Sequence, residues 1–169
     1  MKRYLLVIEL FFAICVYSQN STIDGFWGFK FGESKDVIVN SIRKRFGGDI
    51  KINERKGNLF ISPAEFGEIV FGIAYLRFTD DKLYSGFFTK DTKDIDLAIY
   101  ISRNIKRGLC GKYGEPKNSE SDMLLRYTWG KDDRATVMLE LRIGKDNIEH
   151  EVSLLYEDFR LRKNSIDDF

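Results

Sequence analysis

Histidine and cysteine are scarce in this sequence of 169 residues, which contains one histidine and two cysteines. A zinc site needs about four clustered ligands of these types, so a Cys/His metal centre is excluded. Acidic pairs stand at Asp80-Asp81, Asp132-Asp133 and Asp167-Asp168, but none lies in a loop with the alternating oxygen ligands of an EF-hand. The sequence therefore predicts no metal site.

Motifs of the common enzyme classes are missing as well. The sequence has no Gly-x-Ser-x-Gly nucleophile elbow, no phosphate-binding loop and no dinucleotide fingerprint. His150 could serve as a general base beside a carboxylate, but on a strand Glu149 and Glu151 would point to the opposite face. We interpret His150 as a residue at the rim of the core, and we predict no catalytic residue and no cofactor.

The apolar run Tyr4 to Val16 stands near the N-terminus, directly after Lys2 and Arg3. A basic start, an apolar segment and acceptable cleavage-site residues at Val16-Tyr17-Ser18 are typical of a secretory signal peptide. We therefore expect residues 1–18 to be removed. The mature protein would be exported, either periplasmic or secreted, in a Gram-negative envelope.

Two other uses of this segment stay open. A membrane anchor needs ~20 apolar residues to cross a bilayer, and this run is shorter. Lipidation at Cys15 requires a small residue directly before the cysteine, and Ile14 is not small. Apart from these routes we expect no contact with a membrane.

Charge and cysteine content limit the partners of the mature chain. Removing Lys2, Arg3 and Glu9 lowers the basic count from 27 to 25 and the acidic count from 26 to 25, so the remainder is neutral. A neutral chain lacks the positive field on which non-specific nucleic-acid binding depends. Cys110 is then the only cysteine, which excludes an internal disulfide, and we interpret it as a small buried hydrophobic residue.

The stretch Phe26 to Gly47 contains the clearest structural signals. Trp27, Phe29 and Phe31 alternate with Gly28 and Lys30, as in a strand that lies on a core. A helix follows, with Ser34 as its N-cap, Asp36 in its first turn and a glycine after its last turn. Its inward stripe is Ile38, Ile42 and Phe46.

A second helix, about Lys93 to Tyr113, repeats some of these signals. Thr92-Lys93-Asp94-Ile95 resembles the start of the first helix, and Lys112-Tyr113-Gly114 resembles its end. About three strand-like runs follow each helix. The chain is therefore either a loose repeat of two αβββ units, over about 26–90 and 91–157, or a single domain whose two capped helices are alike by chance.

Short turns between the strand-like runs indicate antiparallel pairing. We expect an α+β domain over residues 19–157, with about six strands and both amphipathic helices on one face of the sheet. Ile69 to Phe78 is the longest expected strand. Lys117 to Asp122 is expected to be a loop, and 158–169 a tail that is either frayed or a short helix.

Aromatic residues are numerous, with 14 Phe, eight Tyr and two Trp. Most must fill the core, but two helices cannot cover them all. Those that face outward on the uncovered side of the sheet would form an anchor patch of the kind on which protein interfaces depend. The candidate interaction surface consists of Tyr75, Tyr84, Phe88, Arg126, Met138 and Arg142.

The segment Phe29 to Val37 resembles the glycine-x-serine-x-x-x-valine helix entry of two groups of small exported modules. These are the outer-membrane assembly lipoproteins of the SmpA/OmlA type and the β-lactamase inhibitory proteins. The second group is built from tandem helix-plus-sheet units whose aromatic sheet surface grips a partner enzyme. This chain departs from it by lacking paired cysteines, and from the first group by lacking a suitable lipid-attachment cysteine.

Three functions follow from these observations. The first is an exported, non-enzymatic domain that binds another protein or an envelope component through the open face of its sheet. The second is an enzyme with an unrecognised carboxylate site. The third is a carrier that holds an apolar ligand between sheet and helices.

Overall fold

The computed structural model describes residues 21–47, 50–130, 134–145 and 149–162. These residues form two helices, α2 (Lys35–Phe46) and α3 (Ile95–Tyr113), with an eight-stranded antiparallel sheet and two small hairpins. The expected α+β class is confirmed, but the main sheet has eight strands rather than about six. The strands are β1 Gly25–Phe26, β2 Phe29–Lys30, β3 Lys51–Arg55, β4 Asn58–Ser62, β5 Ala64–Phe66, β6 Ile69–Phe71, β7 Ile73–Thr79, β8 Lys82–Thr92, β9 Lys117–Ser121, β10 Leu124–Gly130, β11 Ala135–Arg142 and β12 His150–Asp158.

The expected signal peptide at 1–18, with Cys15, lies outside the described residues, as do Asp132-Asp133 and Asp167-Asp168. Neither α2 nor α3 has the length and apolar character of a membrane-spanning helix, and the described residues contain no other α-helix.

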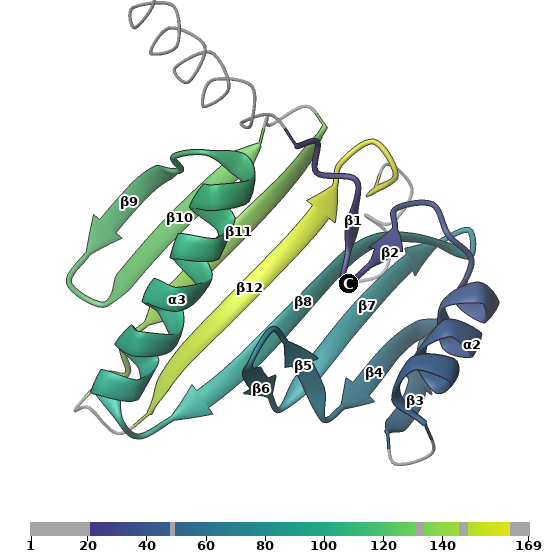
Figure 1. The fold of residues 1–169 in the computed structure, drawn as a ribbon, viewed down its shortest axis with the longest axis horizontal. Coiled ribbons are helices and arrows are strands. Elements are labelled where there is room, and N and C mark those ends of the chain that lie inside the picture. The colour runs from purple at the N-terminus through teal and green to yellow at the C-terminus, as the bar shows by residue number, and fades with distance from the viewer. Residues whose placement is uncertain (1–20, 48–49, 131–133, 146–148, 163–169) are drawn as a thin grey trace, which may run out of the picture.

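The main sheet consists of two meanders that meet in its middle. Its strand order is β3-β4-β7-β8-β12-β11-β10-β9, so α2 precedes one run of four strands and α3 precedes the other. The second run begins with β9, an additional strand at Lys117–Ser121, where a loop was expected. Figure 1 shows both helices and both hairpins in front of the main sheet. We call this side the helix face and the opposite side the open face.

The expected strand around Trp27 is wrong, because the chain reverses direction there. β1 and β2 form a hairpin in which Phe26 pairs with Phe29. The two turn residues, Trp27 and Gly28, have φ values of 56° and 87°. Two positive φ values are typical of the tight turn that joins antiparallel strands, and they are costly for a residue with a side chain.

The expected long strand Ile69 to Phe78 is also wrong, since the chain breaks at Gly72. The first part, β6, pairs with β5 in a hairpin that lies over the helix face, and the second part, β7, belongs to the main sheet. Phe71 of β6 is fully buried and stacks on Phe88 of β8, with ring centroids 5.0 Å apart. This hairpin therefore adds a layer to the core that strand periodicity does not predict.

The helix ends agree with the sequence signals in part. Ser34 is the N-cap of α2, but the amide of Lys35 donates to the carboxylate of Asp81, at 3.3 Å. In α3 the N-cap is Asp94 rather than Thr92, and its carboxylate accepts hydrogen bonds from the amides of Asp96 and Leu97. In the sequence comparison Thr92 corresponds to Ser34, but the cap of α3 lies two residues after Thr92. The two similar segments therefore do not start their helices at the same position.

The expected tail begins inside the fold. Asp158 is the last residue of β12, and its side chain is 2% exposed. Its carboxylate accepts from the backbone and guanidinium of Arg160, at 2.5–3.0 Å. Burial raises the pKa of Asp158, but the hydrogen bonds and charge of Arg160 outweigh it, so the pKa lies below its usual value.

We expect Asp158→Asn to lower the free energy of unfolding at pH 7 by about 1.5–3 kcal/mol, the contribution of a hydrogen bond to a charged group. A depressed pKa stabilises the fold above the unfolded value of ~3.9, and this contribution is lost as the pH falls through the folded value. Denaturant titrations should therefore show a smaller difference between wild type and variant below pH 3. An equal difference at both pH values would contradict this assignment.

Candidate functional site

The open face carries one continuous row of apolar side chains across the five central strands that run from β4 to β11. Register places each member directly opposite the next, from Phe60 through Tyr75, Phe87 and Leu155 to Met138. Phe60 stacks on Tyr75 at 4.4 Å, and Tyr75 meets Phe87 edge-on at 5.0 Å. We call these five residues the apolar row, and all of them are partly exposed.

Polar residues flank the apolar row on both sides. On one side Glu140 of β11 binds Arg126 at 2.5 Å and Arg142 at 3.3 Å, and Arg142 also lies 3.6 Å from Glu151. The side chain of Glu140 is only 11% exposed, so the two arginines neutralise a nearly buried carboxylate. On the other side Arg77 donates to the hydroxyl of Ser85. A hollow of about 280 Å³ lies where the apolar row meets these charges.

The structure places five of the six predicted surface residues on the open face. Tyr75 and Met138 belong to the apolar row, and Arg126 and Arg142 flank it. Tyr84 lies beneath the guanidinium of Arg77 and is 6% exposed, so a partner cannot reach much of it.

The sixth predicted residue, Phe88, lies in the core, so its assignment to the interaction surface is wrong. It is 0% exposed and contacts Phe26, Trp27, Phe66 and Phe71 on the helix face. Its chain neighbour Phe87 occupies the open face instead, because successive side chains of a strand point to opposite sides. The sequence did not predict Phe60, Phe87 and Leu155 as members of this surface. For Leu155 a signal was present, because Leu154 and Tyr156 face the core and a strand turns the residue between them to the opposite face.

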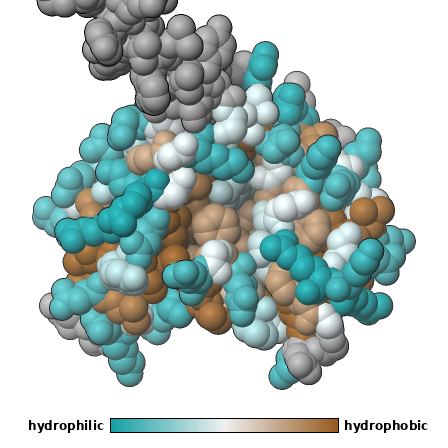
Figure 2. All heavy atoms as spheres, in the orientation of Figure 1, coloured by the Kyte–Doolittle hydropathy of each residue, from teal (hydrophilic) through white to brown (hydrophobic). Residues whose placement is uncertain are grey.

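A second feature is a cleft of about 910 Å³ on the helix face, where the carrier hypothesis placed a ligand, although the sequence did not predict the residues that line it. One wall is α3, and the other consists of the β1–β2 and β5–β6 hairpins with Arg45 of α2. The floor is apolar and includes Tyr156 of β12. In Figure 2, apolar residues are visible at the bottom of this hollow, between hydrophilic residues on either side.

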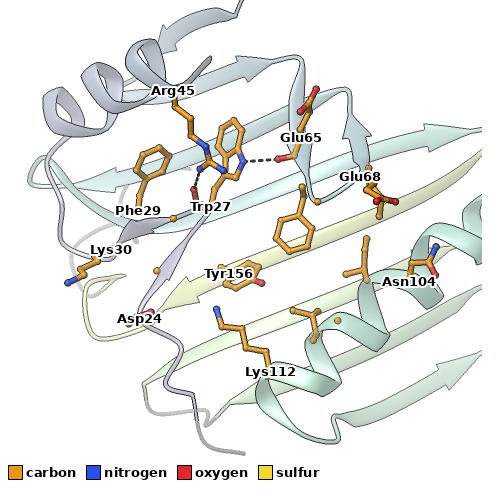
Figure 3. A pocket seen from close by; sticks show the side chains of 18 of the residues that line it. Asp24, Trp27, Phe29, Lys30, Arg45, Glu65, Glu68, Asn104, Lys112 and Tyr156 are labelled. Carbon is orange, nitrogen blue, oxygen red and sulfur yellow. Dashed lines mark hydrogen bonds between the residues drawn. The ribbon is translucent and has the colours of Figure 1, made fainter. Parts of the chain in front are cut away.

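Trp27 holds the hairpin wall of the cleft together. Its indole Nε1 donates to the carbonyl of Glu65 at 2.7 Å, which joins the two hairpins, and Arg45 donates to the Trp27 carbonyl at 3.3 Å. Its ring stacks on Phe46 with centroids 5.0 Å apart. Figure 3 shows the two hydrogen bonds, which together with the Phe46 ring hold Trp27 in its strained turn conformation.

Two titratable groups in and near the cleft have raised pKa values. Burial, with a contribution from Tyr113, raises the pKa of Tyr156 above its ordinary value, so its hydroxyl stays neutral. Burial and the charge of Glu115 raise the pKa of the Cys110 thiol. The carboxylates of Glu65 and Glu68 are exposed on one hairpin, so the cleft does not hold them as a buried acid–base pair.

His150 lies in the core at the start of β12, and neither imidazole nitrogen has a hydrogen-bond partner among the described residues. Within the described part of the chain, no three His, Cys, Asp or Glu side chains come together as metal ligands.

A scan of protein-family models gave no match to this chain. Searches of curated proteins and of solved structures found no similar protein either. The sequence resemblance to the exported modules therefore stays a prediction, and the site must be interpreted from its own geometry.

Proposed function

We propose that this protein is a non-enzymatic binding protein, and that the open face of its sheet binds an amphipathic helix of another protein. The observation that carries the proposal is the apolar row, five side chains in direct register on a face that neither helix covers. Apolar residues in such a row gain free energy only when another surface removes them from water.

The dimensions of the apolar row suit a helix. Neighbouring strands lie ~4.8 Å apart, so five strands span about 19 Å. A helix rises 1.5 Å per residue, so a helix of about 13 residues matches this length. Two residues along a strand cover about 7 Å, which places the polar flanks beside a helix of about 10 Å diameter.

The exposed arginines on this flank can pair with carboxylates beside the apolar stripe of a partner. Arg142 is 57% exposed on its side chain and Arg126 42%, whereas Glu140 between them is nearly covered. Glu151 on the same flank is 35% exposed, so the accessible charge is mixed, and both arginines are more exposed than this carboxylate. Arginines at the rim of an apolar patch are typical of protein interfaces, where they pair with carboxylates.

Strand addition at the edges of the sheet is a poorer alternative. The edge strand β3 begins with Lys51 and ends with Arg55, and the other edge strand, β9, begins with Lys117. Charged side chains on edge strands, lysine above all, hinder pairing with another chain. The face of the sheet, rather than its edge, is thus the better binding surface.

Export to the cell envelope is part of the proposal and is supported by the signal-peptide pattern of residues 1–18. The resemblance at Phe29 to Val37 to exported modules supports the same location. Cell fractionation of the full chain should recover a shortened protein outside the cytoplasm. Recovery of the full-length chain in the cytoplasm would contradict export without affecting the binding surface.

Site-specific photo-crosslinking tests the binding surface. We would place benzoylphenylalanine at Phe87 or Met138 on the open face and, as a control, at the exposed Tyr100 on the helix face. The same partner protein should be crosslinked from the first two positions and not from the third. Adducts from Tyr100 alone, or adducts with a second copy of this chain, would overturn the proposal.

The affinity of open-face variants for the purified partner tests the apolar row quantitatively. Phe87→Asp places a charge in the middle of the apolar row, so we expect binding to weaken at least about 30-fold, the loss of one hot-spot residue. Lys51→Asp at the edge is the control and should change affinity less than threefold. Calorimetric titration measures both, and an unchanged affinity for Phe87→Asp would show that the apolar row is not the binding site.

A further inference from the structure

We infer that the cleft on the helix face is a second binding site, for an amphipathic anion with an acyl chain and one carboxylate or phosphate group. This site is separate from the open face, because the sheet lies between them. The volume of about 910 Å³ lies within the range of ~300–1,000 Å³ typical of small-molecule sites.

The floor of the cleft fits the acyl chain. Tyr156 of the floor and Trp27, Phe29, Ile105 and Leu109 of the walls line the cleft, and each is nearly covered by protein. They come from β1–β2, α3 and β12, so three parts of the fold contribute apolar surface. An acyl chain laid on this floor would lose contact with water without leaving a buried polar group unpaired, since the indole of Trp27 is already hydrogen bonded.

The charges around the cleft are separated along its length. Lys30 and Lys112 line one part of it together with Asp24, and Arg45 lies beside Trp27, between this part and the β5–β6 hairpin, so the described residues of the first part carry a small excess of positive charge. Figure 3 shows Lys112 extending from α3 towards Tyr156. The carboxylates of Glu65 and Glu68 belong to the other part, on the β5–β6 hairpin. This arrangement places an anionic head group near Lys112 and the chain towards β5–β6.

Gly108 of α3 forms an open section of the wall. Glycine in a helix interior costs about 1 kcal/mol relative to alanine. A Cβ at this position would meet no atom within 4 Å, so close packing against the protein does not require the glycine. The open space at Gly108 leaves room for a ligand to approach the helix backbone, as the space at Gly111 does outside the cleft.

The lip of the cleft provides an apolar entrance. Tyr100 of α3 lines the cleft and is 63% exposed, and Leu97, one turn before it, is exposed too. Large apolar side chains in this position let an acyl chain slide from a lipid surface to the floor. The glycine and this entrance support the same class of ligand as the floor and the charges.

Calorimetric titration of the intact protein with palmitate, 1-palmitoyl-lysophosphatidate and hexadecanol tests the inference, with both anions below their micelle concentrations and hexadecanol below its solubility limit. Palmitate and lysophosphatidate should bind at 1:1, and the one that binds more tightly identifies the head group as carboxylate or phosphate. Hexadecanol should bind at least tenfold more weakly than the tighter anion. Failure of both anions to bind, or equal affinity for hexadecanol, would overturn the inference.

Matched variants locate the site. Gly108→Phe fills the cleft from a position where the fold has free space, so anion affinity should fall at least tenfold. Gly111→Phe, on the same helix but outside the cleft, should change it less than twofold. Equal effects of the two variants would contradict the location.

Charge variants and the partner assay separate this site from the open face. Lys112→Gln should weaken the anions about three- to tenfold and leave hexadecanol unchanged, whereas Arg107→Gln, outside the cleft, should alter neither. Phe87→Asp should bind palmitate like wild type, and Gly108→Phe should bind the partner protein like wild type. Loss of both activities in one folded variant would contradict two independent sites.

Discussion

Phe88→Ala is expected to lower the free energy of unfolding by about 3–5 kcal/mol, the usual cost of removing a fully buried phenylalanine. Phe88 is 0% exposed, and four aromatic rings surround it with centroids 4.7–5.5 Å away. These rings come from β1, from the β1–β2 turn and from the β5–β6 hairpin. The cavity would therefore weaken the attachment of both hairpins to the main sheet, as denaturant titration can measure.

Phe87→Ala is the matched control, since it removes the same side chain from the next position in the chain. Phe87 lies on the open face and is partly exposed, so we expect a loss of no more than about 1–2 kcal/mol. Its main effect should fall on partner binding. If Phe87→Ala destabilised the protein more than Phe88→Ala, the two faces of β8 would be assigned the wrong way round.

Gly86→Ala is the second large effect, although it adds only one methyl group. A Cβ at Gly86 would lie 2.2 Å from Cδ1 of Phe26, and two more ring atoms lie within 2.6 Å. Phe26 is almost completely buried on the helix face, so its ring must leave the core. We expect a loss of about 3 kcal/mol, close to the cost of removing Phe26 itself. Gly72→Ala is the control, because its nearest contact is an ordinary 4.0 Å.

A double-mutant cycle identifies the mechanism of this loss. Once Phe26→Ala has removed the ring, Gly86→Ala no longer meets an obstacle, so the double variant should be about as stable as Phe26→Ala alone. Additive losses would show that Gly86 is required for a reason other than the Phe26 ring. Because Phe26 anchors β1 over the sheet, Gly86→Ala should also weaken anion binding in the cleft.

Local signals were sufficient to predict the two helices and most strands of the main sheet. The stripe Ala98, Ile101, Ile105 and Leu109 is buried in α3, and β11 alternates as expected. The hairpins could not be predicted in this way, because Trp27 adopts a turn conformation that normally selects Asn, Asp or Gly. The alternation of Trp27, Phe29 and Phe31 therefore did not indicate one continuous strand.

The assignment of Phe88 failed for a specific reason. A β-bulge lies between Arg77 and Phe78, opposite the start of β8. It changes the alternation of β8, so that Leu83 and Phe88 are both in the core although they are five residues apart. Tyr84 consequently lies on the open face. Sequence periodicity alone cannot locate a bulge when both parities of a strand are apolar.

The cleft was beyond the reach of sequence patterns because its parts are far apart in the chain. Trp27, Glu65, Gly108 and Tyr156 come from four elements that only the tertiary fold brings together. The open face was easier to predict, since strand alternation and antiparallel pairing define which residues share a face. Met138, Arg126 and Arg142 followed from that rule.

Methionine-methyl NMR of the protein with its crosslinked partner tests most directly whether the open face is the binding surface. Met138 lies in the apolar row, whereas Met123 lies next to the β10 end of the sheet, outside that row. Saturating partner should shift or broaden the Met138 methyl signal and leave Met123 nearly unchanged, and palmitate should affect neither. A Met138 signal that stays unchanged at saturation would contradict the proposed function.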